Sequence, residues 1–265
     1  VWTLILAIIT FYYQKYQNNT LKLRADHKMN YVFILLATLF LLPSIYINNM
    51  VYKSLKAQMF LLQDFNSNQF NLNFNQLDQI VPDIPNITVT TIPINSIKAR
   101  YFLNAKRYDQ ALELLQKGTK ANPYLYYSEI LKSQIFQEKG QLDSAKFYAQ
   151  KAFLGLPNND LHATRYVNLL NITRDREGLE EAFGLLTAKK KFNNWKNYLI
   201  VANSLYPPKD KALIKKAKKA TNIFPNNEEI KALYLQIALG QSQMQAAASF
   251  SSKALEYYNA QDYLN

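Results

Sequence analysis

The hydrophobic pattern divides the chain into an apolar start and a longer region with helical periodicity. Residues 1–13 carry no charge, and a second uncharged run of seventeen residues extends from Tyr31 to Ile47. This length is near the lower limit for a helix that crosses a bilayer, and the run has no polar face. We therefore expect residues 1–47 to form two transmembrane helices, the first of them truncated. The alternative is a soluble domain that buries both helices.

The segment between the two apolar runs is basic. It carries Lys15, Lys22, Arg24 and Lys28 against one acidic residue, Asp26. Short loops that are rich in lysine and arginine stay on the cytoplasmic side of a membrane. We therefore expect everything after the second run to lie on the opposite side, which in a bacterial inner membrane is the periplasm. Because the chain begins inside an apolar run and shows no signal-peptide pattern, we also expect it to be the C-terminal part of a longer membrane protein.

Residues 48–91 have the pattern of a connector. Apolar residues recur at three- and four-residue spacing from Val51 to Leu62, which predicts an amphipathic helix that continues to about Asp64. An Asn- and Gln-rich stretch follows, with one short helix expected from about Asn75 to Val81. Three prolines between residues 82 and 93 then exclude a long helix.

From residue 92 onward the sequence repeats with a period of 34. Ala111 and Ala145 are 34 residues apart, as are Pro123 and Pro157, and Pro225 follows after twice that interval. This period, with small residues where helices cross and a proline after each second helix, resembles the tetratricopeptide repeat family. The other small positions are Ala247, Gly118, Ala152, Ala220 and Ala254, with Gly140 at a turn and Leu179 as the exception. The resemblance implies an all-α fold in which residues 92–261 form an α-solenoid of about five helix pairs.

A stacked solenoid of this kind has a concave groove, and repeat position predicts which side chains line it. They are Arg100, Gln134, Gln137, Thr164, Asn168 and Asn171. An amide-rich groove suits an extended protein segment or a glycan, bound through hydrogen bonds. The alternative for each residue is a polar face that meets only water.

The composition excludes several kinds of chemistry. The chain has 31 Lys and Arg against 19 Asp and Glu, two His and no Cys, so disulfides, thiolate catalysis and cysteine-based metal sites are excluded. Adjacent acidic pairs such as Glu180 and Glu181 point apart on a helix and make no acid–base pair. His162 is expected to be structural. We predict no catalytic residue, no metal site and no cofactor in this chain.

The positive charge concentrates near the C-terminal end of the repeats. Candidate contacts to anionic lipid or glycan are Lys211, Lys215, Lys218 and Lys219. No aromatic residues alternate with these lysines, so a stacking surface for nucleic acid is not expected. The alternative is a solvated helix face.

The order of transmembrane helices, connector and repeats, with the segments NPYLYYSE and FLGLPNNDLHATRYV, resembles the C-terminal part of the O-antigen ligase and polymerase-like membrane proteins that carry tetratricopeptide repeats. The resemblance implies a periplasmic domain that binds a partner beside a glycan-transferring membrane domain, whose own functional residues lie outside this chain. The alternative is a non-enzymatic, membrane-tethered scaffold for protein–protein interaction in the cell envelope.

Overall fold

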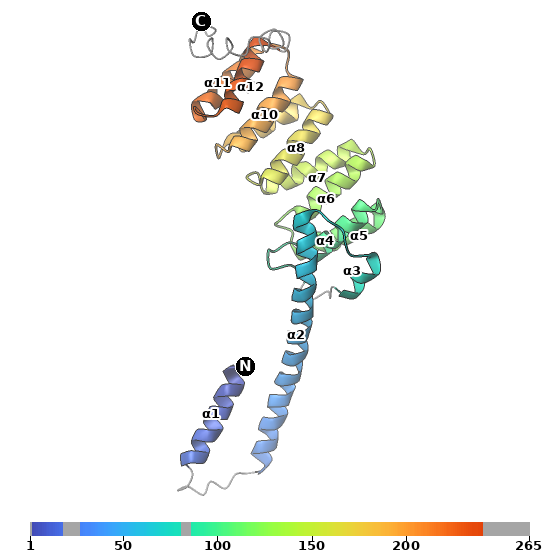
Figure 1. The fold of residues 1–265 in the computed structure, drawn as a ribbon, viewed down its shortest axis with the longest axis vertical. Helices are drawn as coiled ribbons and strands as arrows, with labels where there is room; N and C mark the ends of the chain where they lie inside the picture. The colour runs from blue at the N-terminus through green and yellow to red at the C-terminus, as the bar shows by residue number, and fades with distance from the viewer. Residues whose placement is uncertain (1, 18–26, 81–85, 241–265) are drawn as a thin grey trace. The chain divides into compact units, whose positions relative to one another are not determined.

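The computed structural model describes residues 2–17, 27–80 and 86–240, and these residues form twelve α-helices (Figure 1). The chain divides into two compact units, Val1–Lys56 and Ala57–Asn265. In the described ranges the extended pairing is an isolated antiparallel bridge between Ile87 and Pro93, with no strand. The predicted all-α class is therefore confirmed.

The first unit contains one helix that could span a membrane, rather than the predicted two. Helix α1, Trp2–Gln17, has 16 residues, which at 1.5 Å per residue is shorter than a hydrocarbon core of about 30 Å. Helix α2, His27–Ser67, has 41 residues, and its segment from Ile34 is long and apolar enough to cross a bilayer. Among the described residues, the expectation of two spans is thus corrected to one candidate.

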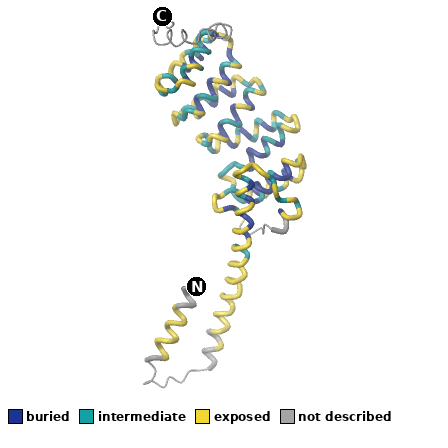
Figure 2. Tube along the Cα trace, viewed as in Figure 1, coloured by how far each residue is buried: buried dark blue, intermediate teal, exposed yellow. Residues whose placement is uncertain are grey.

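Within α2, the described residues of the apolar segment are exposed (Figure 2). Leu35 and Phe40 are 69% and 70% exposed. The hydroxyls of Thr38 and Ser44 donate to the backbone carbonyls of Ile34 and Phe40, at 2.8 Å each. Since these two polar groups are satisfied inside the helix, the segment is compatible with a hydrocarbon environment.

The second unit begins within α2 and contains the other ten helices. Helix α3, Phe74–Ile80, lies where the sequence predicts a short helix. Nine helices follow: α4 (Ile94–Asn104), α5 (Tyr108–Ala121), α6 (Tyr127–Glu138), α7 (Leu142–Gly155), α8 (Asp160–Ile172), α9 (Arg176–Thr187), α10 (Phe192–Leu205), α11 (Lys211–Ile223) and α12 (Glu228–Leu239). Each of the pairs α4–α5, α6–α7, α8–α9 and α10–α11 is in contact and joined by a short turn.

The turns inside these four helix pairs recur with nearly constant spacing. Each contains a residue in the left-handed region: Lys106 with φ 58°, Gly140 with φ 72°, Arg174 with φ 54° and Lys209 with φ 62°. Their spacings are 34, 34 and 35 residues. The sequence identifies Gly140 because glycine adopts this conformation freely. Lys106, Arg174 and Lys209 carry no such signal, so the backbone repeats more regularly than the residues do.

The small residues of the repeat lie where helices approach closely. Ala111, Ala145, Ala152 and Ala220 are fully buried. At Gly118, an added Cβ would lie 2.1 Å from Ser96 Oγ and 2.9 Å from Ser128 Oγ, so α4, α5 and α6 meet there. Ala247 and Ala254 lie outside the described residues.

The third helix pair departs from the predicted alanine pattern. Leu179 is fully buried, and the preceding Gly178 makes the close approach instead. A Cβ at Gly178 would lie 2.7 Å from Leu170 Cδ2. In this pair the small residue is therefore Gly178, one position before Leu179, and α8 and α9 still approach closely.

Side chains at helix N-termini help to fix where the later helices begin. The side chains of Asn159, Asp175, Asp210 and Asn227 each accept a backbone N–H from the first turn that follows. Such caps stabilise a helix by about 1 kcal/mol each. Two of them open α8 and α12, the first helices of their pairs, and the other two open α9 and α11.

Candidate functional site

The first helices of successive pairs, α4, α6, α8, α10 and α12, lie in a row that we call the first-helix row (Figure 1). Side-chain hydrogen bonds join each helix to the next. Ser96 bonds Ser128 at 2.7 Å, and Arg165 Nε donates to Ser133 Oγ at 3.0 Å. Both pairs are 32 residues apart, close to one repeat. Further along, Lys196 on α10 pairs with Glu229 on α12.

The middle of this row uses two of the predicted groove residues to hold helices together. Asn197 Nδ2 donates to Thr164 Oγ1 at 2.9 Å, and Ser204 Oγ donates to Asn171 Oδ1 at 2.7 Å. Both bonds join α8 to α10. Asn168 lies between Thr164 and Asn171 on α8 and is exposed. Of the three predicted residues on α8, Asn168 is therefore the one whose amide faces outward.

Two other predicted residues, Arg100 and Gln134, line one pocket at the amino-terminal end of the row. The pocket has a volume of about 570 Å³. Its walls come from α4, from the start of α5, from α6 and from the segment after α2. The lining residues are Asn68, Phe70, Arg100, Leu103, Asn104, Lys106, Tyr108, Leu131, Gln134 and Glu138. Gln137, also predicted, is half-buried on α6 and does not line the pocket.

Arg100 is held in place by the connector that precedes the repeats. Its Nη2 donates to Asn68 Oδ1 at 2.9 Å, and its guanidinium lies 4.6 Å from the ring centre of Phe65 and 5.4 Å from that of Phe70. Such cation–π contacts hold a guanidinium flat against a ring. Sequence reasoning missed Asn68 and Phe70 because they lie in the connector, outside the repeat pattern.

Asp64 attaches the same connector to α4. Its carboxylate is 5% exposed and accepts from the backbone N–H of Asn71, from the Asn71 side chain and from the hydroxyl of Tyr101 on α4. Burial and this bond to a carboxylate raise the pKa of Tyr101 well above its usual range. Tyr101 therefore stays protonated and keeps donating to Asp64, so the connector remains attached to α4.

Glu138 on α6 also lines the pocket and accepts hydrogen bonds from two neighbours. Tyr108 Oη donates to Glu138 Oε2 and Gln134 Nε2 donates to Glu138 Oε1, at 3.1 Å each. Partial burial, with the hydrogen bond to this carboxylate, raises the pKa of Tyr108. A carboxylate offers about four acceptor positions, so Glu138 keeps free lone pairs after accepting these two bonds.

The four lysines predicted to contact anions lie on α11. Lys211, Lys215, Lys218 and Lys219 are all exposed, and α11 contains no acidic residue. Lys216, on the same helix, is turned inward and pairs with Glu180 on α9. The exposed lysines therefore form one basic helix face, while Lys216 serves the packing of α9, α10 and α11.

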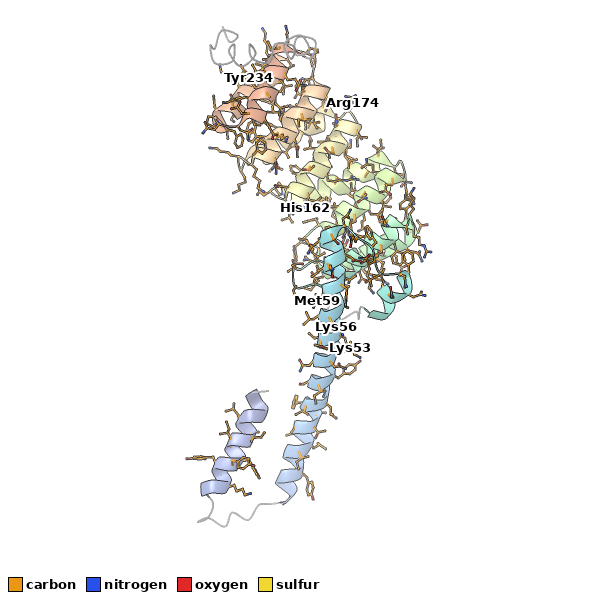
Figure 3. The ribbon with its side chains drawn as sticks, viewed as in Figure 1. Lys53, Lys56, Met59, His162, Arg174 and Tyr234 are labelled. Carbon is orange, nitrogen blue, oxygen red and sulfur yellow. The ribbon has the colours of Figure 1, made fainter. Side chains whose placement is uncertain are left out.

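His162 lies at the start of α8 and is 1% exposed (Figure 3). Burial lowers its pKa, and a hydrogen bond to the backbone carbonyl of Ala152 and the charge of Glu129 oppose this shift only in part. Glu129 on α6 is equally buried, with Lys151 Nζ 3.6 Å and Lys132 Nζ 4.0 Å from its Oε1. The buried carboxylate of Glu129 thus joins α6 to α7 through Lys151, and His162 bonds α8 to the backbone of α7.

The described residues contain no group of three His, Asp or Glu side chains arranged to hold a metal ion. The densest titratable cluster surrounds Glu180, which accepts from Tyr198, Tyr206 and Lys216. Burial and the bond to Glu180 raise the pKa of Tyr198 above its usual range. Because the Glu180 carboxylate already accepts from three donors, this cluster is a packing feature of α9, α10 and α11.

Comparison of the chain with protein-family models, with curated proteins and with solved structures gives no significant match. The candidate site is therefore defined by its own geometry: a row of hydrogen-bonded first helices with a pocket at its amino-terminal end.

Proposed function

We propose that this chain is a membrane-tethered binding domain of the tetratricopeptide-repeat type, whose first-helix row receives a protein or glycan partner. The observation that carries the proposal is the recurrence of the left-handed turn residues at 106, 140, 174 and 209, one per helix pair. A solenoid of identical helix pairs presents its first helices as one continuous surface. Four pairs and the first helix of a fifth lie within the described residues, in keeping with about five units.

The tether in this proposal is α2. Its apolar segment has the length and composition of a membrane span, and the same helix continues to Ser67. Its last turns belong to the second unit, where Ala57 and Leu61 are buried in the core. A single helix therefore carries both the candidate span and a part of the repeat unit.

The side of the membrane follows from the basic loop between the apolar runs, and we propose a periplasmic repeat unit in a bacterial inner membrane. The chain has no cysteine, so single cysteines report position without background. Lys215→Cys on exposed α11 should react with a membrane-impermeant maleimide added to spheroplasts. Lys15→Cys should react only after the membrane is permeabilised. The reverse pattern, or reaction of both variants from outside, would overturn the orientation.

We further propose that the unit is the C-terminal binding part of an O-antigen ligase or polymerase-like protein. The segments NPYLYYSE and FLGLPNNDLHATRYV, together with the order of helices and repeats, support this proposal. Deletion of residues 92–265 from the native protein should then change the chain length or the transfer of surface polysaccharide, while the remainder still fractionates with membranes. Unchanged polysaccharide would favour the alternative of a non-enzymatic envelope scaffold. In that case, the deletion should remove envelope proteins that co-purify with the native protein.

A further inference from the structure

We propose that the pocket between α4, α6 and the segment Asn68–Phe70 binds a small polyhydroxylated anion, a sugar that carries a carboxylate or a phosphate. This inference deepens the proposed binding function and rests on it. Three properties of the pocket support it: its unbalanced charge, a cation fixed in advance, and a polar wall.

The charge that the pocket leaves unbalanced is positive. It contains two cations, Arg100 and Lys106, and one carboxylate, Glu138. Glu138 is already solvated by the hydroxyl of Tyr108 and the amide of Gln134. Lys106 is exposed, at the left-handed turn between α4 and α5. An anion that enters the pocket therefore meets two cations, while the single carboxylate is held by neutral donors.

Arg100 is positioned before any ligand arrives. The rings of Phe65 and Phe70 pack against the guanidinium, and Asn68 accepts from one of its N–H groups. A guanidinium has five N–H donors in a rigid fork, so donors remain for a carboxylate or a phosphate. Because the side chain is already ordered, binding costs less conformational entropy than it would at a free arginine.

The wall of the pocket is suited to hydroxyl groups more than to an apolar side chain. Asn68, Asn104 and Gln134 contribute amides, which both donate and accept. Leu103 and Leu131 also line the pocket, but they are only 7% and 6% exposed and offer little apolar surface. The hydroxyl groups of a sugar can bond several amides at once, whereas a peptide side chain of leucine or valine type offers these amides no hydrogen bond.

The size is compatible with such a ligand. The volume of about 570 Å³ falls within the range of small-molecule sites, about 300–1,000 Å³. Phe70 and Tyr108 also line the pocket and provide the limited apolar contact that a sugar ring requires.

The experiment is a calorimetric titration of the full chain in detergent with D-glucuronate, D-glucose 6-phosphate, D-glucose, acetate and inorganic phosphate. At least one of the two charged sugars should bind about tenfold more tightly than glucose, as expected for a charge-assisted hydrogen bond. Binding of glucuronate alone identifies a carboxylate ligand, and binding of glucose 6-phosphate alone identifies a phosphate ligand. Equal binding of glucose, or equal binding of acetate or phosphate without the sugar, overturns the proposal.

Variants test whether binding occurs in this pocket. Lys106→Gln should weaken the charged sugar severalfold, and Arg100→Gln about tenfold or more. Arg100 also holds the connector, so its loss can affect folding, whereas Lys106 is exposed and its variant should melt as the parent does. Lys120→Gln removes an equal charge from an exposed position on α5, outside the pocket, and should bind as the parent does.

Equal weakening by Lys106→Gln and Lys120→Gln would show a nonspecific charge effect and overturn the site. Absence of binding by both charged sugars at concentrations up to about 10 mM would also overturn it, because a specific site of this kind binds more tightly than that. Neither result bears on the membrane orientation or on the polysaccharide phenotype, so the proposed function fails or stands by its own tests.

Discussion

Two stretches of the first-helix row contain predicted groove residues and use them differently. On α8, Thr164 and Asn171 bond to side chains of α10, one repeat further on. On α4 and α6, Arg100 and Gln134 face a pocket instead. The difference arises from the neighbours: α8 is followed by a helix with matching Asn and Ser residues, whereas α4 is the first of the row and is flanked by the connector. A repeat position thus fixes where a side chain lies, and the adjacent element decides whether it is available.

The largest effect is expected where the pocket end of the row is held together. Gly118→Ala places a Cβ within 2.1 Å of Ser96 Oγ and 2.9 Å of Ser128 Oγ, so the two serine hydroxyls must break their bond to each other or α5 must move away from α4 and α6. Overpacking of this kind costs about 1–3 kcal/mol in free energy of unfolding. Denaturant unfolding measures the change. The matched control is Gly184→Ala on α9, where nothing lies within 4 Å and the substitution should stabilise by up to about 1 kcal/mol.

The junction between the pocket end and the middle of the row should respond to pH through His162. Because burial lowers the pKa of His162 in the folded protein, the unfolded chain binds protons more readily as the pH falls below about 6.5. Stability is therefore fully present above that pH and is lost as the pH falls through the lowered pKa. His162→Gln, which cannot titrate in this range, should flatten the pH dependence of urea midpoints between pH 7 and 5. An unchanged slope would show that His162 does not contribute.

The comparison itself is tested by removing one amide from each stretch. Asn171→Ala should cost about 0.5–1.5 kcal/mol in free energy of unfolding, because it removes the bond between α8 and α10. Gln134→Ala should cost less, since its bond to Glu138 lies within one helix and joins no two helices. A double-mutant cycle of Thr164→Ala and Asn197→Ala should give a positive coupling energy. Equal costs at Asn171 and Gln134 would contradict the distinction between the stretches.

The smallest effect on stability is expected on α11. Replacement of Lys211, Lys215, Lys218 and Lys219 by Gln should leave the free energy of unfolding within about 0.5 kcal/mol of the parent, because exposed side chains without buried contacts contribute little. The same variant tests the predicted anion contact. Its association with vesicles containing anionic lipid should fall, and more so at low salt. A large loss of stability would instead show that these lysines have a packing role.

The periodic spacing of residues in the sequence predicted much of the fold. The 34-residue spacing of Ala111 and Ala145 predicted that both would be buried at helix crossings, and both are fully buried. Leu179 misled the alanine pattern, because Gly178 supplies the close approach one residue earlier. The two apolar runs predicted two membrane helices, the first of them truncated, whereas one helix among the described residues is long and apolar enough to span a bilayer. The spacing of residue types therefore predicts which positions are buried better than it predicts which residue makes the close contact between two helices.

The spacing of residues along the chain was enough to predict the helical class, the repeat period, the small residues at crossings and the positions of the polar face. These are local properties, set by spacing along one chain. Three other features came from the packed helices alone: Asn68, Phe65 and Phe70 fix Arg100, Ser204 bonds Asn171, and Lys106 adopts a left-handed turn. Each of these depends on groups brought together by packing, or on backbone geometry that the turn imposes on whatever residue occupies it. Contacts of that kind have no periodic signature, because each forms between segments with different sequences.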